Sequence, residues 1–217
     1  MSIIKIFFLK IFIISIEKIY SFYLFKKIIR KSIKISMLHP GVLALIYYFA
    51  KYTNGYVLEI GSYIGGSTSV IAHARKNHKN TFISIEMGGI NNHPEIPSQN
   101  IFKDLKSNLI KLDLINYVKL LNGFSNDANI INNVKSLVGN KKISLLVIDA
   151  DGNVERDIEN YKHLLQDNCI IILDDYNTPE LIKVLPTKTY TDKAVKEKSI
   201  TKLAIVKWGT FIGLYNK

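Results

Sequence analysis

A stretch of glycine and polar residues near position 60 has the residue types and spacing that bind a nucleotide-like anion. It comprises Glu59, Gly61, Ser62, Gly65, Gly66, Ser67 and Thr68. Glycine lets the backbone turn sharply and approach a ligand closely. Ser67 and Thr68 offer N-cap oxygens to a helix predicted over 67–78, and a helix N-terminus that follows bare backbone favours anions. The alternative is an ordinary turn from a strand to a helix.

The spacing of the three glycines disfavours one class of cofactor. They lie at offsets 0, +4 and +5, whereas the dinucleotide fingerprint has glycines at offsets of about 0, +2 and +5. The difference argues against a nicotinamide-dependent enzyme.

Polar side chains also follow other apolar, β-rich runs. Glu86 follows Phe82 to Ile85, and Ser125 follows the run that begins near Tyr117. A carboxylate after the second strand can accept hydrogen bonds from both hydroxyls of a ribose, as it does in dinucleotide sites. We therefore expect Glu86 to bind the ribose of a nucleotide. The alternative is that acids at strand ends are only solvated stops.

Three aspartates form a second group. Asp149 ends the run that begins at Ile143, and Asp174 and Asp175 end the run that begins at Cys169. If these strands are neighbours, the carboxylates converge at one edge of a sheet and repel one another unless they hold a cation or retain protons. Oxygen ligands of this kind select Mg²⁺, Ca²⁺ or Mn²⁺ rather than zinc. The alternative is that the three acids only cap loops.

An alternation of strands and helices is needed to position these side chains. Apolar, β-rich runs begin near Tyr56, Thr81, Tyr117, Ile143 and Cys169. Segments with helical spacing lie at 67–78, 100–113, 126–138 and 153–166. A further helix is predicted from Val42 to Lys51, and an antiparallel hairpin from Ser199 to Tyr215. The predicted fold class is α/β: a doubly wound, Rossmann-like, mostly parallel sheet that ends in an antiparallel hairpin, with an N-terminal helical extension.

The segment from Glu59 to Thr68 resembles the first motif of class I S-adenosylmethionine-dependent methyltransferases. It is most similar to the branch that holds the small metal-dependent O-methyltransferases and the sugar O-methyltransferases. The resemblance covers about residues 37–217. It implies that S-adenosylmethionine lies across the ends of the first three strands, with Glu86 on the ribose and Ser125 at the adenine edge. The implied cofactor-binding residues are Glu59, Gly61, Ser62, Gly65, Gly66, Ser67, Thr68, Glu86, Ser125 and Asp149.

The same resemblance implies a divalent ion, Mg²⁺ or Mn²⁺. Metal-dependent members carry an aspartate after the fourth strand and a pair of acidic or amide residues after the fifth, and Asp149, Asp174 and Asp175 match these positions. The ion would bind the oxygens of the acceptor, lower the pKa of its hydroxyl and aim it at the methyl group.

The chain departs from the family at Gly152, because relatives often have a histidine or lysine base at that position. Glycine cannot accept a proton. Either Asp151 or another group substitutes, or the metal alone suffices, or the protein is not catalytically normal. We take Asp149 and Asp151 as the predicted catalytic residues.

The chain is 217 residues long and 47% hydrophobic, which suits one α/β domain with an extension. Its formal net charge is +11, but residues 1–36 alone hold eight Lys or Arg and one acid. The remainder has only a small basic excess, so we expect no nucleic-acid partner. The single cysteine, Cys169, lies in an apolar run and indicates a reducing compartment, the cytoplasm.

Residues 1–36 are predicted to be a hydrophobic, basic helical extension, and 37–217 the methyltransferase domain. Four charges interrupt the apolar run from Ile3 to Phe25, so no uncharged run reaches the ~18–20 residues of a spanning helix. A helix that lies in the membrane interface fits the pattern, with its lysines against anionic headgroups at the inner face of a membrane. The alternatives are a spanning helix, or packing on the chain's own core or on a second copy in a homo-oligomer.

The predicted function is S-adenosylmethionine-dependent O-methyl transfer, assisted by a divalent metal, to a hydroxyl of a small molecule, a sugar or a glycolipid. The enzymatic alternative is a metal-independent methyltransferase. The alternative of another class is a non-catalytic, membrane-associated protein that binds S-adenosylmethionine.

Overall fold

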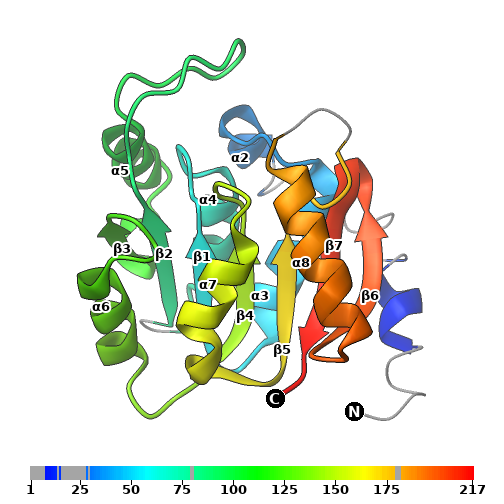
Figure 1. Cartoon of the computed structure of the whole chain (residues 1–217). Helices are drawn as coiled ribbons and strands as arrows, with labels where there is room; N and C mark the ends of the chain where they lie inside the picture. The colour runs from blue at the N-terminus through cyan, green and yellow to red at the C-terminus, as the bar shows by residue number, and fades with distance from the viewer. Residues whose placement is uncertain (1–7, 14, 16–27, 29, 79–80, 179–181) are drawn as a thin grey trace.

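A seven-stranded sheet forms the centre of the computed structural model, which describes residues 8–13, 15, 28, 30–78, 81–178 and 182–217 (Figure 1). The strand order is β3-β2-β1-β4-β5-β7-β6. The strands are β1 Tyr56–Ile60, β2 Phe82–Glu86, β3 Lys119–Asn122, β4 Ile143–Ile148, β5 Leu165–Leu173, β6 Ile200–Val206 and β7 Thr210–Tyr215. The first five pair in parallel, and β7 runs antiparallel to both β5 and β6. The predicted fold class is therefore confirmed.

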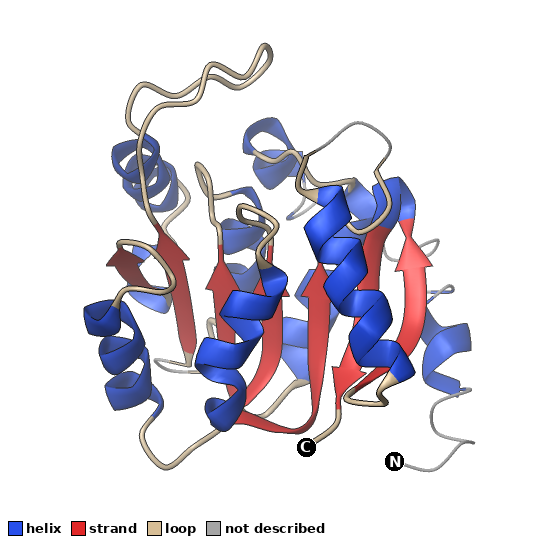
Figure 2. Ribbon diagram, viewed as in Figure 1, coloured by secondary structure: helices blue, strands red, loops and turns tan. Residues whose placement is uncertain are grey.

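Helices cover both faces of the sheet (Figure 2). One face carries α3 Pro40–Tyr52, α4 Gly66–Ala74 and α5 Ile101–Lys111. The other face carries α6 Ala128–Val138, α7 Val154–Tyr161 and α8 Val184–Lys196. Because successive side chains of a strand point to opposite faces, Val57 joins the first apolar layer and Leu58 the second. Short helical segments are α2 Arg30–Ser32, η2 Ile33–Ile35, η3 Ile115–Tyr117, η4 Lys162–Leu164 and η5 Lys207–Gly209.

One prediction about the elements needs correction, and one helix was missed. The helix predicted over 153–166 ends at Tyr161, because Leu165 already pairs with Ile143 in the sheet. Helix α8 was not predicted at all. Its buried positions include Thr187 and Thr191, and threonines on the buried face hide the apolar periodicity that marks a helix in a sequence.

The described part of the N-terminal segment packs on the chain's own core. Residues 8–13 are helical, Ile13 is fully buried, and the rings of Phe12 and Tyr48 lie 4.7 Å apart. Farther along, Ser32 is buried and accepts a hydrogen bond from Ser69 of α4 at 2.7 Å. Within the described ranges, no helix has both the length and the apolar character needed to cross a membrane. Much of the apolar run and the cluster at 26–27 lie outside the described residues, so the boundary at residue 36 stays a prediction.

Candidate functional site

The loop after β1 requires glycine because it touches the end of β4. Gly61 has a φ of +84°, and a Cβ at this position would lie 1.8 Å from the carbonyl oxygen of Asp149. No side chain fits at that distance. Gly61 therefore brings the two strand ends, and whatever they bind, to one place.

The predicted N-caps of α4 are wrong. The helix begins at Gly66, its N-cap is Gly65 in the left-handed conformation, and no side chain caps it. Ser67 and Thr68 consequently fall inside the first turn instead of before it. The hydroxyl of Thr68 donates to Oε2 of Glu59 at 2.7 Å, so it serves the buried floor of the loop rather than the helix end.

Glu59 is a buried carboxylate beneath this loop. Its Oε2 also accepts a hydrogen bond from Ser84 at 2.8 Å, whereas its Oε1 is buried and has no partner among the described residues. Burial raises the pKa of Glu59 to about 7, although hydrogen bonds from Ser67, Thr68 and Ser84 lower it. An unsatisfied buried acceptor is costly, so Oε1 is suited to a donor that a bound ligand would bring.

Glu86 holds the loop from the other side. Its Oε2 accepts the backbone N–H groups of Ser62 and Tyr63 at 2.9 and 2.7 Å, and its Oε1 accepts that of Gly88 at 2.9 Å. The carboxylate is 6% exposed and borders the cavity described next. Glu86 thus fixes the glycine loop and still presents an oxygen-lined edge to a ligand. The sequence indicated the second role but gave no sign of the first.

A cavity of about 270 Å³ opens at the carboxyl ends of the strands. Of the predicted site residues it is lined by Gly61, Glu86, Ser125, Asp149 and Asp151. The other members of the glycine stretch do not line the cavity. They belong to β1, to the loop after it and to the first turn of α4, next to the cavity-lining Gly61. The cavity is also lined by residues that the sequence analysis did not single out, among them Tyr63, Met87, Phe124, Arg156 and Lys183.

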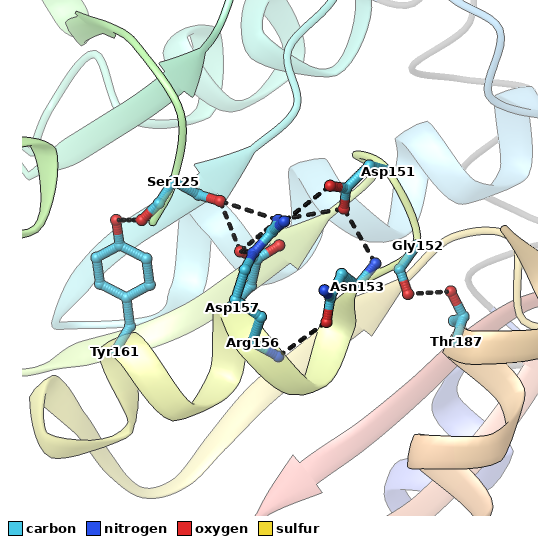
Figure 3. A network of polar contacts seen from close by, with 8 residues as sticks. All are labelled: Ser125, Asp151, Gly152, Asn153, Arg156, Asp157, Tyr161 and Thr187. Carbon is cyan, nitrogen blue, oxygen red and sulfur yellow. Dashed lines mark hydrogen bonds and ion pairs between the residues drawn. The ribbon is translucent and has the colours of Figure 1, made fainter. Parts of the chain in front are cut away.

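Arg156 of α7 ties together two loops of this cavity (Figure 3). Its guanidinium donates to both carboxylate oxygens of Asp151, at 2.8 and 3.1 Å, and to Asp157 at 3.0 Å. It also donates to the hydroxyl of Ser125 at 3.2 Å, and that hydroxyl donates to Asp157 at 2.6 Å. The Ser125 side chain is therefore engaged within the protein. Asp151 and Asp157 are close to Arg156 in the sequence, but Ser125 comes from the loop after β3, and no motif in the sequence signals this contact.

The same contacts bear on the predicted catalytic role of Asp151. Burial would raise the pKa of Asp151, but hydrogen bonds from Arg156 and from the Asn153 amide, with the charge of Arg156, outweigh it and the pKa is lowered. A lowered pKa makes a carboxylate a weaker base. Asp151 is thus better suited to orienting its loop than to removing a proton.

The three aspartates of the second group come together. One carboxylate oxygen each of Asp149, Asp174 and Asp175 lies within 4.8 Å of the other two. Asp174 accepts a hydrogen bond from Thr210 at 2.6 Å. Burial, and then the neighbouring Asp174, raise the pKa of Asp149 well above its usual value, and burial raises the pKa of Asp174 to about 6. Such mutual repulsion is relieved when a cation binds, so this donor set fits a hard divalent ion.

No side chain could stand at position 152. Gly152 has a φ of +86°, and a Cβ there would lie 2.7 to 2.9 Å from atoms of Lys183, including its backbone oxygen and Cα. The chain before α8 occupies the room in which a base would stand. The departure from the family pattern is therefore built into the packing.

Comparison with known proteins adds to this geometry. A sequence model for a family described as a methyltransferase domain matches residues 58–176. An O-methyltransferase from Bacillus cereus, solved in complex with SAH, has a TM-score of 0.64 at 15% identity, over 91% of this chain and 97% of that one. The O-methyltransferase TomG from Streptomyces achromogenes, involved in tomaymycin synthesis and solved with SAM, has a TM-score of 0.64 at 12% identity, over 91% and 96% of the two chains. A search of curated proteins finds no match. At such identities the likeness between structures concerns the fold.

Proposed function

The chain belongs to the methyltransferase-domain family, whose sequence model matches more than half of its length, and we propose that it methylates a hydroxyl oxygen with the help of a divalent ion. The prediction of an S-adenosylmethionine-dependent methyltransferase is confirmed at the level of the family and fold. The oxygen acceptor, the metal and the roles of individual residues are the content of the proposal.

One observation carries it: the cavity beside the glycine loop and the carboxylate cluster share Asp149. This residue lines the cavity together with Gly61 and Glu86, and it is also a member of the cluster with Asp174 and Asp175. A methyl donor held over the glycine loop would therefore lie beside oxygen ligands suited to Mg²⁺ or Mn²⁺. That juxtaposition favours an acceptor whose own oxygens bind metal, a small molecule or a saccharide.

The residues of the chain have separable tasks in this proposal. Gly61 and the amides held by Glu86 shape the surface for the donor, while Glu86 offers carboxylate oxygen to ribose hydroxyls. Asp149, Asp174 and Asp175 would hold the ion, which would lower the pKa of a hydroxyl bound to it. The protein contributes mainly alignment and a preorganised charge distribution, which are large terms in such transfers. No base at position 152 is needed if the hydroxyl bound to the ion would release its proton to water at neutral pH.

Cofactor binding is the first test. Glu86→Ala is expected to weaken S-adenosylmethionine binding by ~1.5–3 kcal/mol, the usual value of hydrogen bonds to charged groups, or roughly 10- to 150-fold. The three amides that Glu86 accepts lose their anchor at the same time. Isothermal titration calorimetry measures the affinity. Glu95→Ala, which removes an exposed carboxylate in the loop that follows β2, serves as control and should bind like wild type. Absence of binding by wild type would end the proposal.

We also propose that the N-terminal segment makes a peripheral contact with a membrane. Arg30, Lys31 and Lys34 are exposed, and residues 1–36 hold eight basic residues and one acid. Phe8 and Ile11 are 65% and 46% exposed beside an apolar cavity of about 670 Å³. Basic charge next to exposed apolar surface suits anionic lipid headgroups. Packing against a second copy of the chain is the competing explanation.

Liposome co-sedimentation separates the two. Binding is expected to rise with the fraction of anionic lipid and to fall with salt, since each basic residue near the surface is worth about 1 kcal/mol. Replacing Lys26, Lys27, Arg30 and Lys31 by Gln should largely release the protein. The matched control replaces four exposed lysines elsewhere by Gln: Lys103, Lys106, Lys111 and Lys119. Equal release by both variants, or a change of oligomeric state in the first, would contradict the membrane contact.

A further inference from the structure

The backbone of Lys183 packs against Gly152, the residue of the loop after β4 that has no side chain. A Cβ on Gly152 would meet the Lys183 oxygen at 2.7 Å and its Cα at 2.8 Å. The first turn of α8 holds this arrangement, because Thr187 donates its amide to the Lys183 carbonyl at 3.3 Å and its hydroxyl to the Gly152 carbonyl at 3.2 Å. The backbone of Lys183 is thus fixed against Gly152, and its side chain extends away from that contact.

That side chain reaches the carboxylates. Its Nζ lies 3.6 Å from Oδ2 of Asp175, and Lys183 lines the same cavity as Asp149. In the part of the chain that the structure describes, this is the one ion pair that any of the three clustered aspartates makes. The contact is longer than a hydrogen bond, and the lysine side chain is 41% exposed. The ammonium can therefore leave Asp175 without unpacking anything.

We propose that Lys183 is a resident cation of the carboxylate cluster, which compensates the cluster's charge without metal and competes with the divalent ion for it. This inference rests on the proposed function, since it concerns the same three aspartates. When all three are ionised, the cluster carries three negative charges, and the ammonium compensates one of them until the ion displaces it. Lys183 then sets the affinity of the ion: the site is preformed and held together without metal, and the ion must displace the ammonium from Asp175.

Other nearby cations do not share this role. Arg156 also lines the cavity, but its guanidinium is used by Asp151 and Asp157. Lys188 lies on α8, the helix that begins directly after Lys183. Its ammonium contacts Asp192 at 2.8 Å instead of the cluster. With a side chain 43% exposed, Lys188 is a close match to Lys183 in type and exposure, so it provides the control.

The experiment is a titration of the full chain with Mn²⁺, followed by calorimetry or by the loss of the free-ion electron paramagnetic resonance signal. Lys183→Met is expected to bind Mn²⁺ roughly tenfold more tightly than wild type, because a positive charge next to a divalent ion is removed. Lys183→Arg, which retains the charge, should stay near wild type, and Lys188→Met should not change the affinity. Without metal, Lys183→Met should melt at a lower temperature than wild type, and Mn²⁺ should reverse the loss.

The outcomes separate this inference from the metal-assisted function. If wild type binds Mn²⁺ and Lys183→Met binds it equally or more weakly, Lys183 does not compete, and the proposed function is untouched. If only Lys183→Met binds the ion, Lys183 is the resident cation and the natural chain works without metal. If neither binds, both the competition and the metal assistance are wrong.

Discussion

Gly61→Ala is expected to destabilise the protein strongly and to abolish S-adenosylmethionine binding. The new Cβ would lie 1.8 Å from the backbone oxygen of Asp149, and two backbones cannot yield as a flexible side chain could. A positive φ at a non-glycine residue adds about 1–2 kcal/mol, and overpacking typically about 1–3 kcal/mol. We therefore expect the free energy of unfolding to fall by ~3 kcal/mol or more, and the melting temperature by roughly 6–12 °C.

A second glycine, Gly89, separates the cost of a positive φ from the cost of a steric clash with the Cβ. Gly89 has a φ of +99°, but nothing lies within 4 Å of a Cβ built on it. Gly89→Ala should therefore cost only about 1–2 kcal/mol, the part due to φ. Thermal melts followed by circular dichroism compare the two variants, and calorimetry reports their cofactor affinity. Equal losses of stability would show that the approach of Gly61 to Asp149 does not hold β1 and β4 together.

The strands and the edge at which the site forms could be predicted because they depend on local pattern. The runs that begin near Tyr56, Thr81 and Ile143 became strands at or next to these residues. Because parallel strands end at one edge, polar residues after them had to lie together. The convergence of Asp149 with Asp174 follows from β4 pairing with β5. The sequence pattern is sufficient where the structure depends only on the periodicity of a strand and on the residues that follow its carboxyl end.

The remainder depends on contacts between distant segments. Ser67 and Thr68 looked like N-caps, yet the left-handed Gly65 starts the helix and their hydroxyls turn to Glu59. Arg156 on α7 and Lys183 in the turn before α8 both line the cavity. How these segments pack against the site cannot be predicted from local sequence spacing. The absence of a base at Gly152 was visible in the sequence, but its reason, the backbone of the segment before α8, was not.

Removal of the proposed divalent ion is expected to have the largest effect on catalysis. Methyl transfer, followed as S-adenosylhomocysteine release with a panel of catechol and vicinal-diol acceptors, is expected to cease in excess EDTA and to return with Mg²⁺ or Mn²⁺. Two adjacent hydroxyls are chosen as probes because together they can chelate one divalent ion. Asp174→Ala should remove most of the activity and weaken Mn²⁺ binding on the order of 100-fold, since a charged ligand is lost. Full turnover in chelator would favour the metal-independent alternative.

Asp174→Asn shows whether such a loss is due to the ion or to misfolding, because the two explanations predict opposite changes in stability. Burial raises the pKa of Asp174 to about 6, so the group is harder to ionise when folded than when unfolded. Its contribution to the free energy of unfolding is therefore lost as pH rises from about 4 toward 6, and the ionised form is the less stable one at neutral pH.

Asparagine at position 174 keeps an oxygen for Thr210, which donates to Asp174 at 2.6 Å, without the charge. Asp174→Asn should thus melt at a higher temperature than the metal-free wild type at pH 7.5 while failing to bind Mn²⁺. Asp151→Ala, which removes the contacts of Asp151 with Arg156 and with the Asn153 amide but leaves the cluster itself intact, should retain the ion. If Asp174→Asn loses both stability and Mn²⁺ binding, the main role of Asp174 is to stabilise the fold and not to bind the ion.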